Sequence, residues 1–238
     1  MRLDKLLSDR GYGTRKEIKK LLSKQGVQIG DVTIKDPGYQ VHPEDVVVFN
    51  GKVVSTERFS YYLFHKPAGC VCANEDHVHP TIFSYVPNPK NTLFSVGRLD
   101  LDTEGLLLIT NDGQLAHALL SPRRHVDKVY YAKLSGAITD DDIRLFAEGV
   151  DIGDEKLCMP ALLERANDSG DEIRITIKEG RFHQVKRMFE AVGKEVLYLK
   201  RESMGPFTLD EQLPAGSYRT LTEEELSYLQ GFTNHTKE

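Results

Sequence analysis

The sequence predicts an α+β protein made of two parts, a small N-terminal module and a larger domain that mixes strands with helices. Leucine and isoleucine recur at helical spacing in residues 1–26. Short alternating or fully apolar runs, typical of strands, follow from residue 27 to residue 199 and are separated by helical patterns. A chain of 238 residues can bury one large core, or one small and one medium core.

The small module is predicted to span residues 1–56. Residues 2–10 place leucines on one helical face, and Thr14 with Glu17 has the spacing of a capping box before a second amphipathic helix. Two hairpin patterns follow the helices. They are Val27–Ile29 with Val32–Ile34 and Val46–Phe49 with Lys52–Val54.

The larger domain is predicted to span residues 61–238, after a short polar linker at 55–60. Apolar or alternating runs predict five strands. These are 61–64, 106–109, 128–134, 173–177 and 196–199. Helices are expected from Asp112 to 120, over 137–150, in the segment that begins at Gly180, and after 222. In the second of these, Ile143, Phe146 and Ala147 are expected to face inward.

Charge is distributed unevenly along the chain. The net charge is −5, but residues 1–30 carry eight bases and three acids, a local +5, whereas the remainder is strongly acidic. Four of these bases lie on the second helix, away from its apolar stripe. They are Arg15, Lys16, Lys19 and Lys20. A basic end on an acidic body predicts an electrostatic contact surface at that end.

Composition argues against several classes of protein. The chain has no apolar run of 18 residues, and Met1–Lys5 lacks the apolar centre of a signal peptide, so a cytoplasmic protein without membrane contact is expected. Three cysteines provide no disulfide framework. Cys70 and Cys72 precede His77 and His79, but this spacing is not usual for structural zinc, so no metal is expected. The sequence also has no glycine-rich phosphate-binding motif.

The candidate site is the charged stretch Gly97-Arg98-Leu99-Asp100-Leu101-Asp102-Thr103-Glu104-Gly105. It leads into the apolar run 106–109, which is predicted to be a buried strand. Unpaired charges near a core cost several kcal/mol to desolvate, so such a cluster is expected to be paired or functional.

This stretch resembles the catalytic motif of the pseudouridine synthases, in the RsuA branch that modifies bacterial ribosomal RNA. Further resemblances lie in Lys66-Pro67-Ala68-Gly69, in Lys128-Val129-Tyr130, in Gly180–Arg187 and in the tail Pro214–Thr222. Residues 1–56 resemble the alpha-L RNA-binding module. The resemblance implies a catalytic domain with a mixed, mainly antiparallel sheet and flanking helices.

The resemblance also assigns catalytic roles. Asp100 is the expected essential carboxylate, and Tyr130 is expected to stack on the target base, with Tyr131 on the opposite face of the strand. A carboxylate that must stay ionised in a closed pocket needs a cationic neighbour. Lys186 matches the family's basic residue, but the adjacent Arg187 competes for this role and the sequence leaves the choice open.

RNA contacts are expected from two regions. Arg98 is expected to fill the gap left by a flipped base or to clamp a phosphate. The other residues expected to contact RNA are Arg15, Lys16, Lys19 and Lys20 of the small module, and Arg181 and Arg187 of the larger domain.

The expected activity is conversion of one uridine of 16S ribosomal RNA to pseudouridine by a monomer that uses no cofactor. Its expected partner is ribosomal RNA, within a partly assembled small subunit. Three alternatives stay open: a 23S RNA enzyme, a non-catalytic ribosomal RNA-binding assembly factor, and a hydrolase that uses Asp100 and Asp102. The last meets the objection that paired carboxylates usually come from different elements.

Overall fold

A computed structural model describes residues 1–56, 59–88, 92–121 and 124–234. Residues 57 and 58 of the predicted linker lie outside this described part. The chain divides into two compact units, which are Met1–Ser60 with Asn88–Thr92, and Tyr61–Pro87 with Leu93–Glu238. No described helix has the length and apolar character needed to cross a membrane.

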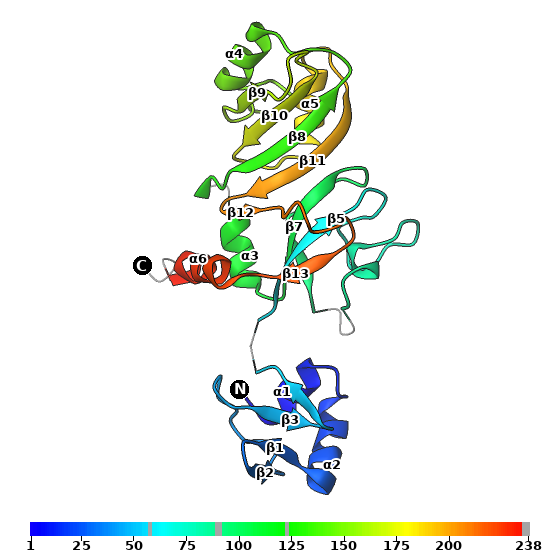
Figure 1. Ribbon diagram of the computed structural model, residues 1–238, viewed down its shortest axis with the longest axis vertical. Helices are drawn as coiled ribbons and strands as arrows, with labels where there is room; N and C mark the ends of the chain where they lie inside the picture. Colours follow the sequence, from blue (N-terminus) through cyan, green and yellow to red (C-terminus); the bar gives the residue numbers. More distant parts are fainter. Residues whose placement is uncertain (57–58, 89–91, 122–123, 235–238) are drawn as a thin grey trace. The chain divides into compact units, whose positions relative to one another are not determined.

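The first unit packs two helices against a four-stranded sheet (Figure 1). The helices are α1 (Leu3–Asp9) and α2 (Arg15–Gln25), and the strands are β1 (Val27–Ile29), β2 (Val32–Ile34), β3 (Val47–Phe49) and β4 (Lys52–Val54). The strand order is β2-β1-β3-β4. The capping box at Thr14 and Glu17 is present, and both predicted hairpins are confirmed.

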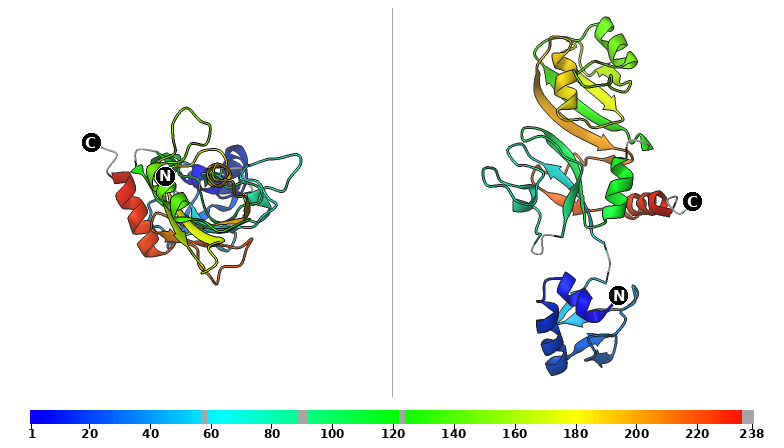
Figure 2. Two further views of the ribbon diagram at one scale, coloured as in Figure 1. Left: turned by 90° about the horizontal axis from the view of Figure 1, so that it is seen from above. Right: turned by 180° about the vertical axis from the view of Figure 1, so that it is seen from behind.

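The second unit is built on a nine-stranded sheet. Seven of its strands follow the order β13-β5-β7-β11-β8-β10-β9, and the other two are β6, which pairs with β7, and β12, which pairs with β11. The strands are β5 (Tyr61–Lys66), β6 (Phe94–Val96), β7 (Glu104–Thr110), β8 (Lys128–Leu134), β9 (Leu162–Arg165), β10 (Glu172–Ile177), β11 (Val196–Met204), β12 (Phe207–Thr208) and β13 (Tyr218–Thr220). Only the β7–β11 pair is parallel among the described strand pairs. The prediction of a mixed, mainly antiparallel sheet is therefore confirmed. Figure 2 shows β11, in orange, as a long curved strand.

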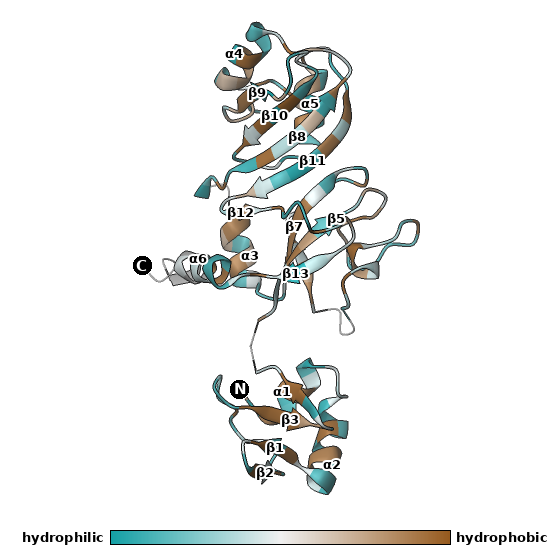
Figure 3. Ribbon diagram, viewed as in Figure 1, coloured by the Kyte–Doolittle hydropathy of each residue, from teal (hydrophilic) through white to brown (hydrophobic). Residues whose placement is uncertain are grey.

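Helices flank this sheet and close two apolar cores. The helices are α3 (Gly113–Leu120), α4 (Asp140–Glu148), α5 (Gln184–Glu190) and α6 (Glu223–Asn234), with a 3-10 turn at Ile82–Ser84. One core packs Phe146 of α4 and Phe189 of α5 on β10. The other packs α3 and α6 on β7. Figure 3 shows the hydrophobic residues concentrated along β7 and α3.

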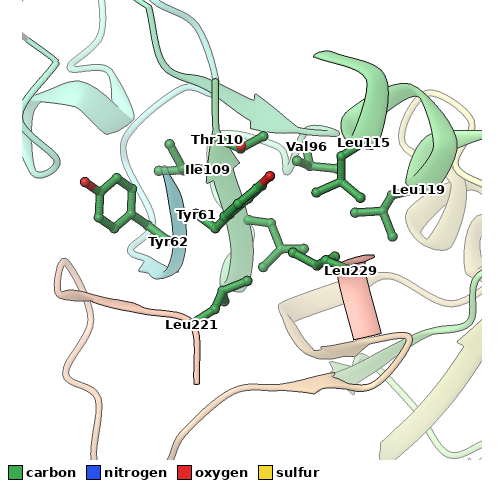
Figure 4. Close-up of a pocket in the computed structure, with 10 residues that line it drawn as sticks. Tyr61, Tyr62, Val96, Ile109, Thr110, Leu115, Leu119, Leu221 and Leu229 are labelled. Carbon is green, nitrogen blue, oxygen red and sulfur yellow. The ribbon is translucent and has the colours of Figure 1, made fainter. Parts of the chain in front are cut away.

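A small gap remains in the second core, between Tyr61, Leu115 and Leu229 (Figure 4). It holds about 10 Å³ and its walls are mostly apolar, so it has room for one water at most. The gap therefore is a packing defect of the core and not a substrate site.

Most of the predicted elements are confirmed, including the buried strand after the charged stretch and the Asp112 cap of α3. One expected core position is wrong. Ala147 is exposed, while Asp142 is buried on the inner side of α4, where it pairs with Lys194. The short strands β6, β9, β12 and β13 were not predicted.

Candidate active site

The charged stretch forms a loop that ends in the buried strand β7. Gly69 donates its backbone N–H to the carbonyl of Leu101 at 2.7 Å, and Thr103 donates to the carbonyl of Asp100 at 3.1 Å. The Asp100 side chain keeps 28% of its surface exposed, whereas Asp102 keeps 70%. The loop thus presents one sheltered and one open carboxylate.

The buried side chain of Lys66 binds this loop through its backbone carbonyls. Its side chain is fully buried, and its ammonium donates to the backbone carbonyls of Asp100 at 2.9 Å and Thr103 at 2.8 Å. A third bond joins it to its neighbour Pro67 at 3.1 Å. A fourth, longer bond reaches the carbonyl of Leu101 at 3.5 Å. Burial lowers the pKa of Lys66, and the four carbonyls offset part of the cost of desolvating the ammonium.

The sequence analysis noted Lys66 only as part of a motif shared with the family and assigned it no role in the site. One signal could have identified it. Residues two apart on a strand share a face, so Lys66 lies on the same face as the fully buried Phe64.

Lys186 and His183 face Asp100 from the start of α5. The Lys186 ammonium lies 3.5 Å from Oδ2 of Asp100 and 2.6 Å from Oδ1 of Asp102. The imidazole Nε2 of His183 lies 3.5 Å from Oδ1 of Asp100. Burial alone would raise the pKa of Asp102, but the hydrogen bond and the charge of Lys186 outweigh it, and the pKa lies below its usual value.

The structure brings Lys186, and not Arg187, to Asp100. The Arg187 guanidinium turns the other way and binds Asp154 at 2.6 Å as well as the backbone carbonyl of Ile152. Successive residues of a helix point in different directions, so only one of the two can face the loop.

Arg181 lies on the same side as Arg187. Its donors bind Glu179 at 3.0 Å and the carbonyls of Lys156 and Leu157 at 2.6 and 2.7 Å. Both arginines therefore hold the segment 152–157 through donors that are already occupied.

Tyr130 is buried in β8, next to an arginine that the sequence prediction did not single out. Arg201 of β11 is 2% exposed, and its Nη1 lies 3.5 Å from the Tyr130 hydroxyl. Its Nε donates to the carbonyl of Leu106 in β7 at 2.8 Å, while its Nη2 is buried with no partner among the described residues. Arg201 thus links Tyr130 to the strand that the Asp100 loop enters.

Gly105 allows the close approach of β7 and β11 at this point. Its φ of 110° is unfavourable for other residues, and a Cβ there would collide with the backbone of Arg201. The two strands pair over only two positions, Lys200 with Glu104 and Arg201 with Gly105. The seam between the two halves of the sheet is therefore narrow.

Arg98 is exposed at the start of the loop. The next residue, Leu99, is hydrogen-bonded through its backbone to the thiol of Cys72. Leu99 donates its N–H to Sγ of Cys72 at 3.3 Å, and the thiol lies 3.5 Å from the Leu99 carbonyl. Burial raises the pKa of the Cys72 thiol. Among the described residues, no three His, Cys, Asp or Glu side chains are placed to hold a metal ion.

The basic residues of the first unit form a separate surface on α2. All four predicted side chains are exposed, and none makes an ion pair with a described residue. They are Arg15, Lys16, Lys19 and Lys20. This face has free donors for an anionic partner.

Comparisons with known proteins agree on one family. A family model described as RNA pseudouridylate synthase matches residues 60–191, and an S4 domain model matches residues 1–47. The chain is 46% identical over 235 residues to "Uncharacterized RNA pseudouridine synthase YtzG" of Bacillus subtilis, covering 96% of this chain and 98% of that protein. It is 39% identical over 230 residues to "Ribosomal small subunit pseudouridine synthase A" of Escherichia coli, covering 95% and 99%.

A solved structure is also similar over nearly the whole chain. It is described as "Crystal structure of pseudouridylate synthase", with a TM-score of 0.68 and 38% identity, and the match covers 96% of this chain and 99% of that one.

Proposed function

The chain belongs to the RNA pseudouridine synthase family, and from this membership we propose that it converts one uridine of 16S ribosomal RNA to pseudouridine with Asp100 as the essential carboxylate. The name of the E. coli relative, which specifies the small ribosomal subunit, supports this choice of RNA. The observation that carries the catalytic assignment is the position of Asp100, a sheltered carboxylate that two basic side chains face at 3.5 Å.

The reaction sets clear demands on the site. The bond between ribose carbon-1′ and base nitrogen-1 breaks, the uracil turns, and a bond forms between carbon-1′ and carbon-5. The carbon-5 proton then leaves, and nitrogen-1 gains a proton. The product is an isomer, so no oxidant, reductant or group donor is consumed, and we propose that no cofactor takes part. The protein must provide an anion beside the sugar, stabilise charge on the departing base and accept a proton.

The residues of the site fit these demands. Asp100 is the anion beside the sugar, because neither of its carboxylate oxygens accepts a hydrogen bond shorter than 3.5 Å from a described residue. Lys186 places a positive charge 3.5 Å from Asp100 and pairs with Asp102 at 2.6 Å. Tyr130 packs against the uracil ring and acts in proton transfer from carbon-5, and Arg201 positions it.

The remaining arginines and lysines divide into two groups. Arg98 is exposed and free to enter the RNA stack or bind a phosphate, and the basic face of α2 binds structured RNA. Arg181 and Arg187 were also expected to bind RNA. Because acids and carbonyls of the chain occupy their donors, we instead propose that they hold the segment 152–157.

The physiological setting is part of the same proposal. We propose a cytoplasmic monomer whose residues 1–56 bind RNA and whose residues 61–238 catalyse the reaction. The acidic body confines electrostatic attraction to one end, which favours a partly assembled small subunit over naked RNA as the substrate.

Pseudouridine mapping tests this function. The purified protein is incubated with 16S and 23S transcripts, each with and without small-subunit proteins. One new pseudouridine in 16S RNA is expected. A site in 23S RNA would reassign the substrate, release of free uracil would indicate a hydrolase, and RNA binding with no modification on any substrate would leave an assembly factor.

A further inference from the structure

Phe182 is a large aromatic side chain left in solvent beside the candidate active site. It is 74% exposed. Its ring stacks on the imidazole of His183, with 3.8 Å between the ring centroids and 19° between the planes. His183 in turn lies 3.5 Å from Asp100. The imidazole of His183 therefore lies between the Phe182 ring and the proposed catalytic carboxylate.

The local backbone holds this pair of rings in place. His183 adopts the left-handed conformation, with φ 49° and ψ 34°, which is unfavourable for a residue with a side chain and persists only where neighbours hold it. The Arg181 N–H donates to Oε1 of the buried Gln184 at 2.9 Å. The Arg187 guanidinium donates to the Phe182 carbonyl at 3.2 Å. The turn that carries the rings is therefore held by hydrogen bonds on both sides of the pair.

We propose that Phe182 is a stacking platform for an unpaired nucleobase next to the target uridine. This inference rests on the proposed function, because it places the target at Asp100. A base drawn out of its stack leaves neighbours with an exposed π-face, and aromatic side chains are the usual partners for such faces. The flat outer side of the Phe182–His183 pair offers this surface.

A nucleobase is a better match than a protein side chain for this surface. One ring, whose second side is already covered by His183, presents a flat face suited to another flat ring. Its place beside Asp100 puts it where RNA must lie in any productive complex. Stacking does not read hydrogen-bonding edges, so the platform positions RNA with little preference for which base is stacked.

The test uses four variants on a protein-free RNA fragment that contains the modified uridine. Phe182→Ala removes the ring, Phe182→Leu keeps an apolar side chain without a ring, and Phe182→Tyr keeps the ring. Leu162→Ala is the matched control, since Leu162 is a 57% exposed apolar residue on β9. We expect Phe182→Ala and Phe182→Leu to raise KM for RNA about tenfold with a smaller change in kcat. Phe182→Tyr and the control stay close to the wild type.

The second arm changes the RNA. Abasic sites are placed one at a time at the nucleotides that flank the target. One of them is expected to raise the KM of the wild type about as much as Phe182→Ala does, and to cause no further increase in that variant, because both changes remove the same stack.

Several results overturn the platform. These are an unchanged KM for Phe182→Ala, wild-type behaviour of Phe182→Leu, additive effects at every flanking position, or an effect that occurs only on particles with small-subunit proteins, which would assign Phe182 to a protein contact. In all of these the wild type still forms pseudouridine, and its failure to do so would instead count against the proposed function.

Discussion

The Lys186 ammonium lies between two carboxylates of one loop, at 2.6 Å from Asp102 and 3.5 Å from Asp100. The shorter contact neutralises Asp102. Asp100 remains in the field of the same cation, yet its oxygens are less engaged and closer to the protein interior. One lysine thus contacts both aspartates, and it holds Asp102 more tightly than Asp100.

Adjacent variants test this arrangement. Lys186→Met should reduce kcat about 10²- to 10³-fold, because the site loses the positive charge that lies 3.5 Å from the Asp100 carboxylate. Arg187→Met should instead cost about 2 kcal/mol of unfolding free energy, because Asp154 and the Ile152 carbonyl lose their donor, with a far smaller change in kcat. Single-turnover rates and urea unfolding measure both quantities. The reverse pattern would make Arg187 the catalytic partner.

Lys66→Met should destabilise the catalytic unit by about 2–4 kcal/mol and slow the reaction of the folded enzyme. The reason is that the carbonyls of Asp100 and Thr103 lose a buried donor. Lys128→Met is the control, since Lys128 is also buried but donates only to the Val126 carbonyl among the described residues. Urea unfolding followed by rate measurements separates the two effects. Equal destabilisation by both substitutions would refute a specific role for Lys66 in holding the loop.

The double substitution Lys19→Ala/Lys20→Ala should weaken RNA binding and reduce the slope of log K against log salt concentration by about 2, as expected for two lost phosphate contacts. Lys35→Ala/Lys52→Ala removes the same charge from exposed positions outside α2. Binding measured over a range of salt concentrations distinguishes the pairs. If both pairs change the slope equally, the effect comes from net charge and not from the α2 face.

Acid should destabilise the protein through Asp142. Burial would raise the pKa of Asp142, but the hydrogen bonds from Lys194 and Thr139 outweigh it and lower the pKa. A depressed pKa in the folded state contributes stability above the ordinary pKa of about 4, and this stability is lost as the pH falls through the folded value. Asp142→Asn should therefore cost about 3 kcal/mol at pH 7 and progressively less below pH 4. Urea unfolding from pH 7 to pH 3 measures this, and a cost that stays constant with pH would contradict it.

Sequence patterns predicted the local features of the fold well. The cap of α2 at Thr14, the cap of α3 at Asp112 and the buried strand after the charged loop each depend on residues close together in the chain. The sequence left open whether Lys186 or Arg187 lies beside Asp100; the structure places Lys186 there, and its catalytic role stays a prediction.

The supports of the site could not be predicted in the same way, because they depend on distant contacts. Lys66 is buried only because carbonyls 34 and 37 residues later surround its ammonium. Arg201 lies in the polar run Lys200-Arg201-Glu202, which suggests solvent exposure, yet the close approach of β7 at Gly105 buries it. Such packing follows from the arrangement of strands and not from local pattern.

The most direct test of the central claim compares Asp100→Asn with Asp102→Asn on the RNA that the wild type modifies. Both variants keep the size of the side chain, and RNA binding measured in parallel shows whether each still forms the complex. We expect Asp100→Asn to lower the rate of pseudouridine formation by about 10³-fold or more while binding persists, and Asp102→Asn to retain most of the activity. A near wild-type rate for Asp100→Asn, or loss of activity in Asp102→Asn alone, would contradict the assignment of Asp100 as the essential carboxylate.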